Sequence, residues 1–226
     1  MEIDASNLNR SLPLRDQIYH KVRSMIVSGQ MKPGEAINEM AIAQSLGVSR
    51  TPVREAVKRI SDEGLVNVFA QTGTFVARIS IRDIEGAYVI RNALEMESAR
   101  RAAEKLTHAQ AEVLEDNIAA HKTAIARGRF SDAIHLDDAF HRTIAEVNGF
   151  SMLWRAVDIS KAQMDRGRYL AIPKPGYGEQ TIQQHQTILK ALQRHDGEAA
   201  ATAMRDHLNT SLRNTLEVAA INNAFG

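Results

Sequence analysis

The chain has 226 residues, a formal net charge of +1, a hydrophobic content of 44% and no cysteine. The absence of cysteine excludes disulfides, cysteine-ligated metal centres and thiol nucleophiles. No apolar run reaches the 18 residues that a membrane helix needs, so no membrane partner is expected. Because residues 1–11 are polar and contain no apolar signal region, we expect no export and a cytoplasmic location.

The first predicted elements follow an irregular arm over residues 1–11. Apolar residues at helical spacing predict a helix from Leu14 to about Ser28. Lys32-Pro33-Gly34 predicts a turn, and 35–37 a short strand. A second, short helix carries Glu39, Ile42, Ala43 and Leu46, and Gly47-Val48 follows it as a tight turn.

The segment Ser49–Ile60 predicts a helix that lies in a DNA groove. Ser49 suits the N-cap and Pro52 suits the first turn. One face is an apolar stripe, formed by Val53, Ala56, Val57 and Ile60. The neighbouring face carries groups that match guanine and phosphate, namely Arg50, Thr51, Arg54 and Lys58. The alternative is a solvated basic face, but the preceding short helix and turn favour a helix-turn-helix.

A hairpin wing is predicted directly after this helix. Gly64 is placed to end the helix, and strands over 65–69 and 75–79 flank a turn whose tip residues, Thr72 and Gly73, are expected to contact DNA. Residues 1–79 hold 10 Lys and Arg against 8 Asp and Glu. Such a small excess of positive charge cannot bind DNA non-specifically over a wide surface. DNA affinity must therefore come from a few well-placed residues, present in two copies within a homodimer.

Residues 80–226 read as helical almost throughout. Caps and turns predict helices over 80–106, from Thr107 to Gly128, from Ser131 to Gly149, and over 151–171, 179–195 and 197–219. Helices of this length form an antiparallel bundle. The predicted fold is therefore mainly α: a winged helix-turn-helix domain in 1–79, followed by an all-α antiparallel helical bundle in 80–226.

One carboxylate and three imidazoles of the bundle form a candidate metal-ligand set. Asp137 and His141 are four residues apart, so they share one helix face. His185 and His207 lie among apolar residues of the last two helices. Imidazole with carboxylate suits zinc, nickel, iron or manganese. The alternative is that these side chains lie at the surface, or lie in the core with their polar atoms hydrogen-bonded. Because ligating imidazoles must be neutral, metal affinity is expected to fall below about pH 6.5.

Two sets of segments resemble known families. Residues 14–18, 32–35, 49–56, 63–66 and 73–76 resemble the winged helix of GntR-family regulators. Residues 137–141, 184–192 and 204–208 resemble the ligand-bearing segments of the all-helical FCD effector domain in the FadR subfamily. The resemblance places that family's metal ligands on Asp137, His141, His185 and His207. It implies the metal-binding branch rather than an acyl-CoA-binding one.

The resemblance does not transfer operator preference, because Met40 stands where the family often has Arg. Arg91, inside the first bundle helix, is a candidate for holding an acidic effector, and its alternative is an ion pair with Glu95 or Glu97. His20, His108, His121 and His195 are expected at the surface, without partners. His135, Asp138, Arg166, Arg168 and Tyr169 are expected on solvated faces.

These observations predict a ligand-responsive DNA-binding transcription regulator. A homodimer would read two half-sites of double-stranded operator DNA, and its bundle would bind a divalent metal and a small organic or sugar acid. The resemblance implies a repressor. One alternative is a metal-dependent enzyme that uses the Asp137, His141, His185 and His207 site. Another is a regulator with a purely structural metal.

Overall fold

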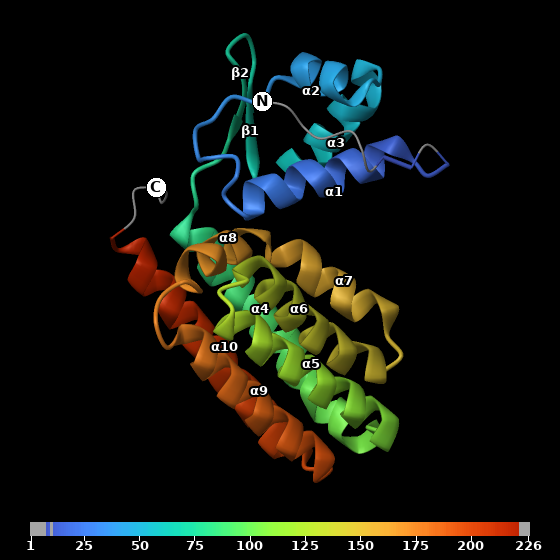
Figure 1. Cartoon of the computed structure of the whole chain (residues 1–226), viewed down its shortest axis with the longest axis vertical. Helices are drawn as coiled ribbons and strands as arrows, with labels where there is room; N and C mark the ends of the chain where they lie inside the picture. The colour runs from blue at the N-terminus through green and yellow to red at the C-terminus, as the bar shows by residue number, and fades with distance from the viewer. Residues whose placement is uncertain (1–7, 10, 222–226) are drawn as a thin grey trace. The chain divides into compact units, whose positions relative to one another are not determined.

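The computed structural model describes residues 8, 9 and 11–221, and the chain divides between Ile79 and Ser80 into two compact units. The arm expected over 1–11 falls mostly outside the described residues. The first unit contains three helices and a hairpin (Figure 1): α1 Leu14–Val27, α2 Glu39–Leu46, α3 Arg50–Asp62, β1 Val66–Phe69 and β2 Gly73–Val76.

Helices α1 and α2 both pack on α3. The apolar stripe predicted for α3 is its buried face, formed by Val53, Ala56, Val57 and Ile60. Gly47 ends α2 in the left-handed region, at φ 62°, a conformation that glycine adopts without steric cost. Ser49 occupies the N-cap position of α3 but makes no side-chain capping hydrogen bond, contrary to expectation.

The wing is a two-stranded antiparallel hairpin, with register running from Val66↔Val76 to Phe69↔Gly73. The strand predicted over 35–37 is reduced to a single bridge, between Ala36 and Phe75. The tip is tight, because Gln71 and Gly73 have φ of 70° and 124°. The hairpin therefore projects as a narrow loop from the core of this unit.

The second unit is a helical bundle in which α4 packs against five other helices and α10 packs against α4, α8 and α9. Seven helices lie in its described part (Figure 1): α4 Ile81–Lys105, α5 His108–Ala126, α6 Phe130–Val147, α7 Ser151–Ser160, α8 Ala162–Ala171, α9 Tyr177–Gln193 and α10 Gly197–Ala219. No helix among the described residues is long and apolar enough to cross a membrane.

Local caps explain where several helices begin. The Ser80 side chain accepts from the Asp83 backbone, and Thr107 caps α5, as predicted. Thr107 also forms a complete capping box with Gln110. The prediction of Ser131 as the N-cap of α6 was wrong. The N-cap is Arg129, two residues earlier and next to the Gly128 turn, and the helix begins at Phe130.

The single helix predicted over 151–171 was also wrong, because the chain breaks at Lys161 between α7 and α8. No Gly or Pro marks the break in sequence. It places the buried Lys161 ammonium 2.7 Å from Asp138 and 2.5 Å from Asp165. Asp165 follows Lys161 by four residues, but the pair with Asp138 of α6 leaves no local sequence signal.

A candidate metal centre and a DNA-reading surface

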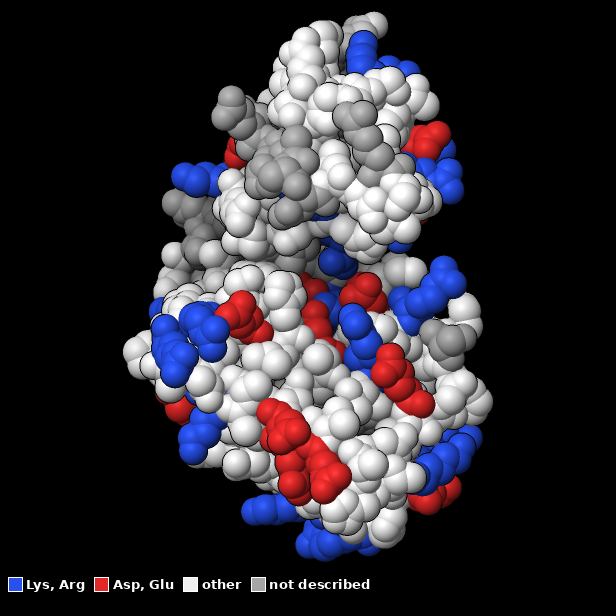
Figure 2. Space-filling model, turned by 45° about the vertical axis from the view of Figure 1, so that its right-hand side comes forward, with Lys and Arg blue, Asp and Glu red and all other residues white. Residues whose placement is uncertain are grey.

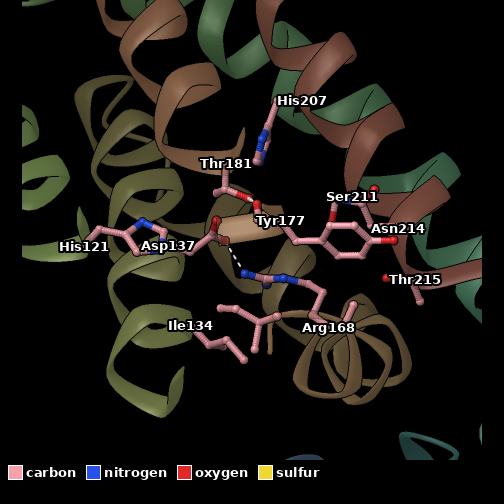
Figure 3. A pocket seen from close by; sticks show the side chains of 12 residues that line it. His121, Ile134, Asp137, Arg168, Tyr177, Thr181, His207, Ser211, Asn214 and Thr215 are labelled. Carbon is pink, nitrogen blue, oxygen red and sulfur yellow. Dashed lines mark hydrogen bonds and ion pairs between the residues drawn. The ribbon is translucent and has the colours of Figure 1, made fainter. Parts of the chain in front are cut away.

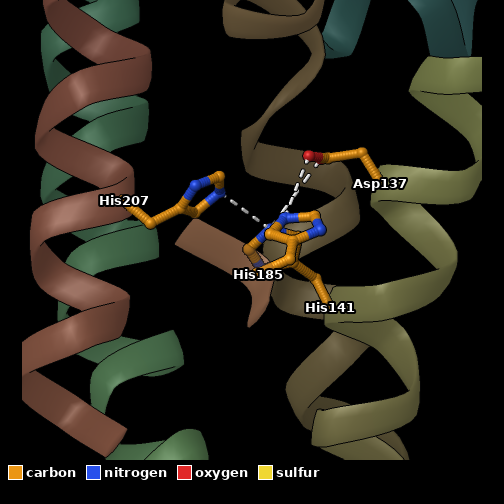
Figure 4. A group of neighbouring side chains, drawn as sticks. All are labelled: Asp137, His141, His185 and His207. Atoms are coloured by element: carbon orange, nitrogen blue, oxygen red, sulfur yellow. Dashed lines mark hydrogen bonds and ion pairs between the residues drawn. The ribbon is translucent and has the colours of Figure 1, made fainter. Parts of the chain in front are cut away.

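Helix α6 supplies two of the four candidate ligands from its buried face. Asp137 and His141 lie one turn apart there, and His185 of α9 and His207 of α10 approach from the facing helices. One donor atom from each residue lies within 4.8 Å of the other three. Figure 4 shows the carboxylate and the three rings turned toward a common centre. All four side chains are buried.

The closest approaches within this metal-ligand quartet are between donor atoms. His141 Nε2 lies 3.1 Å from His207 Nε2 and 3.8 Å from Asp137 Oδ2. His185 Nε2 lies 3.3 Å from Asp137 Oδ1, although neither of its ring nitrogens has a hydrogen-bond partner among the described residues. Buried nitrogens are normally satisfied. Clustered donors with an unsatisfied member form a group that could hold a metal ion.

The three imidazoles differ in what orients them. His141 Nδ1 lies 2.5 Å from the Glu95 carboxylate of α4. His207 Nδ1 lies 3.1 Å from the Gln184 amide oxygen. The ring of His185 stacks on Phe140, with centroids 4.0 Å apart. Polar outer partners such as Glu95 and Gln184 fix the orientation of a ligating imidazole and raise its basicity, whereas Phe140 orients His185 by packing alone.

Arg91 contributes to this arrangement through Glu95. Its guanidinium is 1% exposed, and its Nε lies 2.5 Å from Glu95 Oε1. The ion pair considered as the alternative at the sequence level is therefore present. Contact between Arg91 and an effector stays a prediction.

Arg168 of α8 bonds directly to the Asp137 carboxylate and also reaches Asp138 and Asp165, at 3.3 and 3.0 Å. Its side chain is only 11% exposed. The expectation of solvated faces for Arg168 and Asp138 was therefore wrong. Both belong to a buried ion cluster, formed by Asp137, Asp138, Lys161, Asp165 and Arg168.

Charge and burial set the ionisation of the candidate ligands in opposite ways. Burial is the largest single influence on the Asp137 carboxyl and raises its pKa, but Arg168, together with the neighbouring His185 and His141, outweighs burial and holds the pKa of Asp137 well below its usual range. Burial lowers the pKa of His185. Burial, then the neighbouring His185 and His141 rings, lowers the pKa of His207 well below its usual value. One anionic oxygen donor beside neutral imidazoles is the ligand set that zinc, nickel, iron or manganese accepts.

A cavity of about 50 Å³ adjoins the quartet. Figure 3 shows Asp137 between His121 and Arg168, with polar side chains of α9 and α10 on the far side. His121 was expected at the surface, but it is 1% exposed and lines this cavity. Burial lowers the pKa of His121 to about 4, so its ring is uncharged at neutral pH. His195 was expected to lack a partner, but its Nδ1 lies 2.7 Å from the Ala103 carbonyl oxygen.

The predicted DNA-contacting residues are all exposed on the first unit. Arg50, Thr51, Arg54 and Lys58 lie on the outer face of α3, whereas Thr72 and Gly73 lie at the wing tip. Arg54 Nε lies 3.6 Å from Glu39 Oε2 of α2, a loose pair at the surface. On the face drawn in Figure 2, acidic and basic side chains are interspersed. The candidate DNA contacts are therefore a few exposed side chains of α3 and the wing tip.

Comparison with known proteins agrees with both units. The family described as "Bacterial regulatory proteins, gntR family" matches residues 14–76. The FCD domain family matches residues 86–210. The chain therefore belongs to the GntR family of bacterial regulators and carries an FCD domain. It is a DNA-binding transcriptional regulator.

Similar chains support this assignment. The HTH-type transcriptional repressor RspR of Escherichia coli is 35% identical over 203 residues, covering 90% of this chain and 89% of that protein. Paenarthrobacter nicotinovorans has a probable D-xylose utilization operon transcriptional repressor that is 30% identical to this chain. The match covers 86% of this chain and 87% of that protein. The solved structure of E. coli McbR/YncC has the same fold, with a TM-score of 0.82 at 21% identity over 93% of this chain and 100% of that one.

The sequence reasoning missed Glu95, His121 and Gln184 as site residues. Helical periodicity could have found two of them. Glu95 follows Arg91 by four residues, on the face that also buries Ser98 and Ala102. His121 continues the apolar stripe of Leu114 and Ile118. Arg168 could not be predicted as a site residue, because the break at Lys161 changes which face of α8 is buried.

Proposed function

We propose that this regulator is a metal-dependent, ligand-responsive repressor. The carrying observation is the convergence of Asp137, His141, His185 and His207 from three helices on one buried centre. These residues would hold a divalent transition metal, which would supply Lewis acidity for binding an acid. Repression is supported by the RspR and D-xylose operon relatives, whose descriptions name repressors.

The effector is proposed to be a small organic or sugar acid that enters the cavity beside the quartet. Arg168 lines that cavity and supplies a guanidinium that matches a carboxylate. Arg91 would act through Glu95 and His141, because its guanidinium is already held by Glu95. An effector carboxylate would compete with Asp137 for Arg168.

DNA reading is proposed for the winged-helix domain of residues 1–79, acting in a homodimer. Arg50 and Arg54 would read base edges, while Thr51, Lys58, Thr72 and Gly73 would fix the domain against the backbone and groove. One domain with so small a charge excess offers few phosphate contacts, so two copies on inverted half-sites are needed for tight binding. The domain of residues 80–226 would carry dimerisation and effector binding.

Replacing a ligand separates these roles. His185→Ala removes one of four donors, so metal affinity should fall by more than the 10- to 100-fold typical of losing an outer partner. DNA binding should persist, because the reading residues lie in the other compact unit. The measurement is metal content and operator affinity of full-length protein, with and without a panel of organic acids.

His108→Ala is the matched control, since its side chain is 90% exposed. Full metal content in His185→Ala would overturn the centre. Effector response in a metal-free His185→Ala protein would leave the metal a structural role only. Turnover of an acid by the metal-loaded protein would instead support the enzyme alternative.

A further inference from the structure

The first residue of α2, Glu39, lies against α3 and has no task in the function proposed above. Its Oε2 is 3.6 Å from Nε of Arg54, one of the two arginines proposed to read base edges. The two side chains differ in exposure, since that of Glu39 is 19% exposed and that of Arg54 is 68% exposed. A largely exposed guanidinium is therefore paired with a carboxylate that is mostly covered.

Helix α2 holds Glu39 on a fixed frame. The Asn38 side chain accepts from two backbone N–H groups of the first turn, at 3.0 Å each, and so caps the helix where Glu39 begins it. At the other end Gly47 turns the chain toward α3, on which α2 packs. A carboxylate in the first turn is also favoured by the helix dipole. The position of the Glu39 carboxylate is thus set by backbone structure, whereas Arg54 is a long side chain with many rotamers.

Arg54 differs in this respect from the other basic side chains proposed to contact DNA. Within the described part of the chain, no acidic group lies within ion-pair distance of Arg50 or Lys58. The acidic residue next to Arg54 on α3, Glu55, pairs instead with Arg15 of α1, at 3.9 Å. The carboxylate of Glu39 therefore acts on one candidate base-reading side chain and not on the whole basic face.

The contact is made at Nε, the guanidinium nitrogen nearest the backbone. A guanidinium carries one donor on Nε and two on each terminal nitrogen. Guanine offers O6 and N7 as neighbouring acceptors in the major groove, and an arginine fork can reach both at once. A carboxylate beside Nε leaves the four terminal donors of Arg54 open for that contact. Holding the fork before DNA arrives reduces the rotamer entropy that binding must remove.

We propose that Glu39 is a positioning residue for base reading, which aims the terminal nitrogens of Arg54 at a guanine edge. The inference rests on the function proposed above and deepens it, because it requires Arg54 to read DNA. The Glu39 carboxylate also repels phosphate. On a sequence without the matching guanine, Arg54 gains no contact at the base edge and this repulsion stays uncompensated, so Glu39 raises selectivity more than affinity.

Titration of full-length protein with two DNA probes tests this role. A duplex selected by wild type from a randomised pool serves as operator, and a scrambled duplex of equal composition is the reference. In Glu39→Gln the ratio of operator to scrambled affinity should fall by about tenfold, a coupling typical of two side chains in contact. Affinity for scrambled DNA should rise by about twofold, because one charge that repels phosphate is removed. A merely structural role of Glu39 would lower both affinities together.

Glu55→Gln is the matched control, since Glu55 is also a paired acid of this unit and its side chain is 53% exposed. It should change both affinities by a similar factor and leave their ratio unchanged. Glu39→Asp keeps the charge but shortens the side chain, so it should lower the ratio without raising affinity for scrambled DNA. Unfolding temperatures show that each variant folds, and Glu39→Asp repeats the test should Glu39→Gln not fold.

Arg54→Ala shows whether Glu39 acts through Arg54. In the Arg54→Ala background, Glu39→Gln should have no further effect on the ratio of operator to scrambled affinity. A further fall in that ratio would overturn the inference. It would mean that Glu39 reads a base itself, because a carboxylate can accept from the cytosine amino group.

The same variants separate this inference from the function on which it rests. If wild type selects no sequence, or if Arg54→Ala binds the selected duplex as wild type does, the assignment of Arg54 as a base reader fails and the positioning role fails with it. If Arg54→Ala loses operator affinity while Glu39→Gln keeps the wild-type ratio, the positioning role alone is overturned.

Discussion

The winged-helix unit and the helical bundle place their charged side chains in opposite ways. Every fully buried charged residue in the described part of the chain lies in the bundle, including Arg91, Glu95, Asp137, Lys161 and Asp165. The winged-helix unit buries apolar side chains and Tyr19, and its candidate DNA contacts are exposed. One unit presents its chemistry to water, and the other encloses it.

The difference follows from the size of each partner. DNA is a large polyanion, and exposed guanidinium and ammonium groups reach it without prior desolvation of the protein. A metal ion and a small acid require a preformed, dry site, in which unpaired charges are costly. Variants should therefore act on the first unit through binding alone, and on the second through binding and stability together.

The largest effect is expected for Arg50→Ala/Arg54→Ala on the exposed face of α3. Each substitution removes a guanidinium that can read guanine, at a cost of about 1–3 kcal/mol of specific binding. The double variant should lose about 30-fold or more in operator affinity, with unfolding temperature and metal content unchanged. Titration of operator and scrambled DNA measures it, and wild-type operator affinity would contradict the assignment of α3 as the recognition helix.

The two units also differ in how much of each could be predicted from the sequence. The stripe of α3, the Gly64 turn and the wing were predictable, because each rests on neighbours within a few residues. The Asp137 and His141 pair was visible as one helical turn, His185 and His207 were candidates because they lie among apolar residues of the last two helices, and the resemblance implied all four as ligands. Two of the partners that surround these ligands were not predictable, since Arg168 and Gln184 meet the quartet only through tertiary packing.

A smaller effect on binding, accompanied by a loss of stability, is expected when an outer partner is changed within the bundle. Glu95→Gln keeps the size of the side chain but removes the carboxylate beside His141 Nδ1. Loss of such a partner typically weakens metal binding by 10- to 100-fold. The variant also leaves Arg91 buried without its carboxylate, so stability should fall by about 3–5 kcal/mol. Competition with a chromogenic chelator measures the affinity, and chemical denaturation measures the stability.

The double variant Arg91→Met/Glu95→Gln separates the two consequences. It removes both buried charges, so stability should recover while metal affinity stays low. Metal affinity that returns to the wild-type value would show that Glu95 only balances Arg91. Substitution of Arg50, Arg54 or Lys58 on the winged-helix unit has no such stability cost, because these three side chains are exposed.

The smallest effect is expected for Lys58→Ala, an exposed residue on α3. A lysine that contacts phosphate carries no sequence information, so operator and scrambled DNA should lose affinity by a similar factor. Each phosphate contact contributes about −0.9 to the slope of log affinity against log salt concentration, so the slope should become shallower by about 1. Lys190→Ala, an exposed substitution on α9, is the control and should leave the slope unchanged. A selective loss on operator DNA in Lys58→Ala would show instead that this side chain reads a base, which would place three base-reading residues on α3.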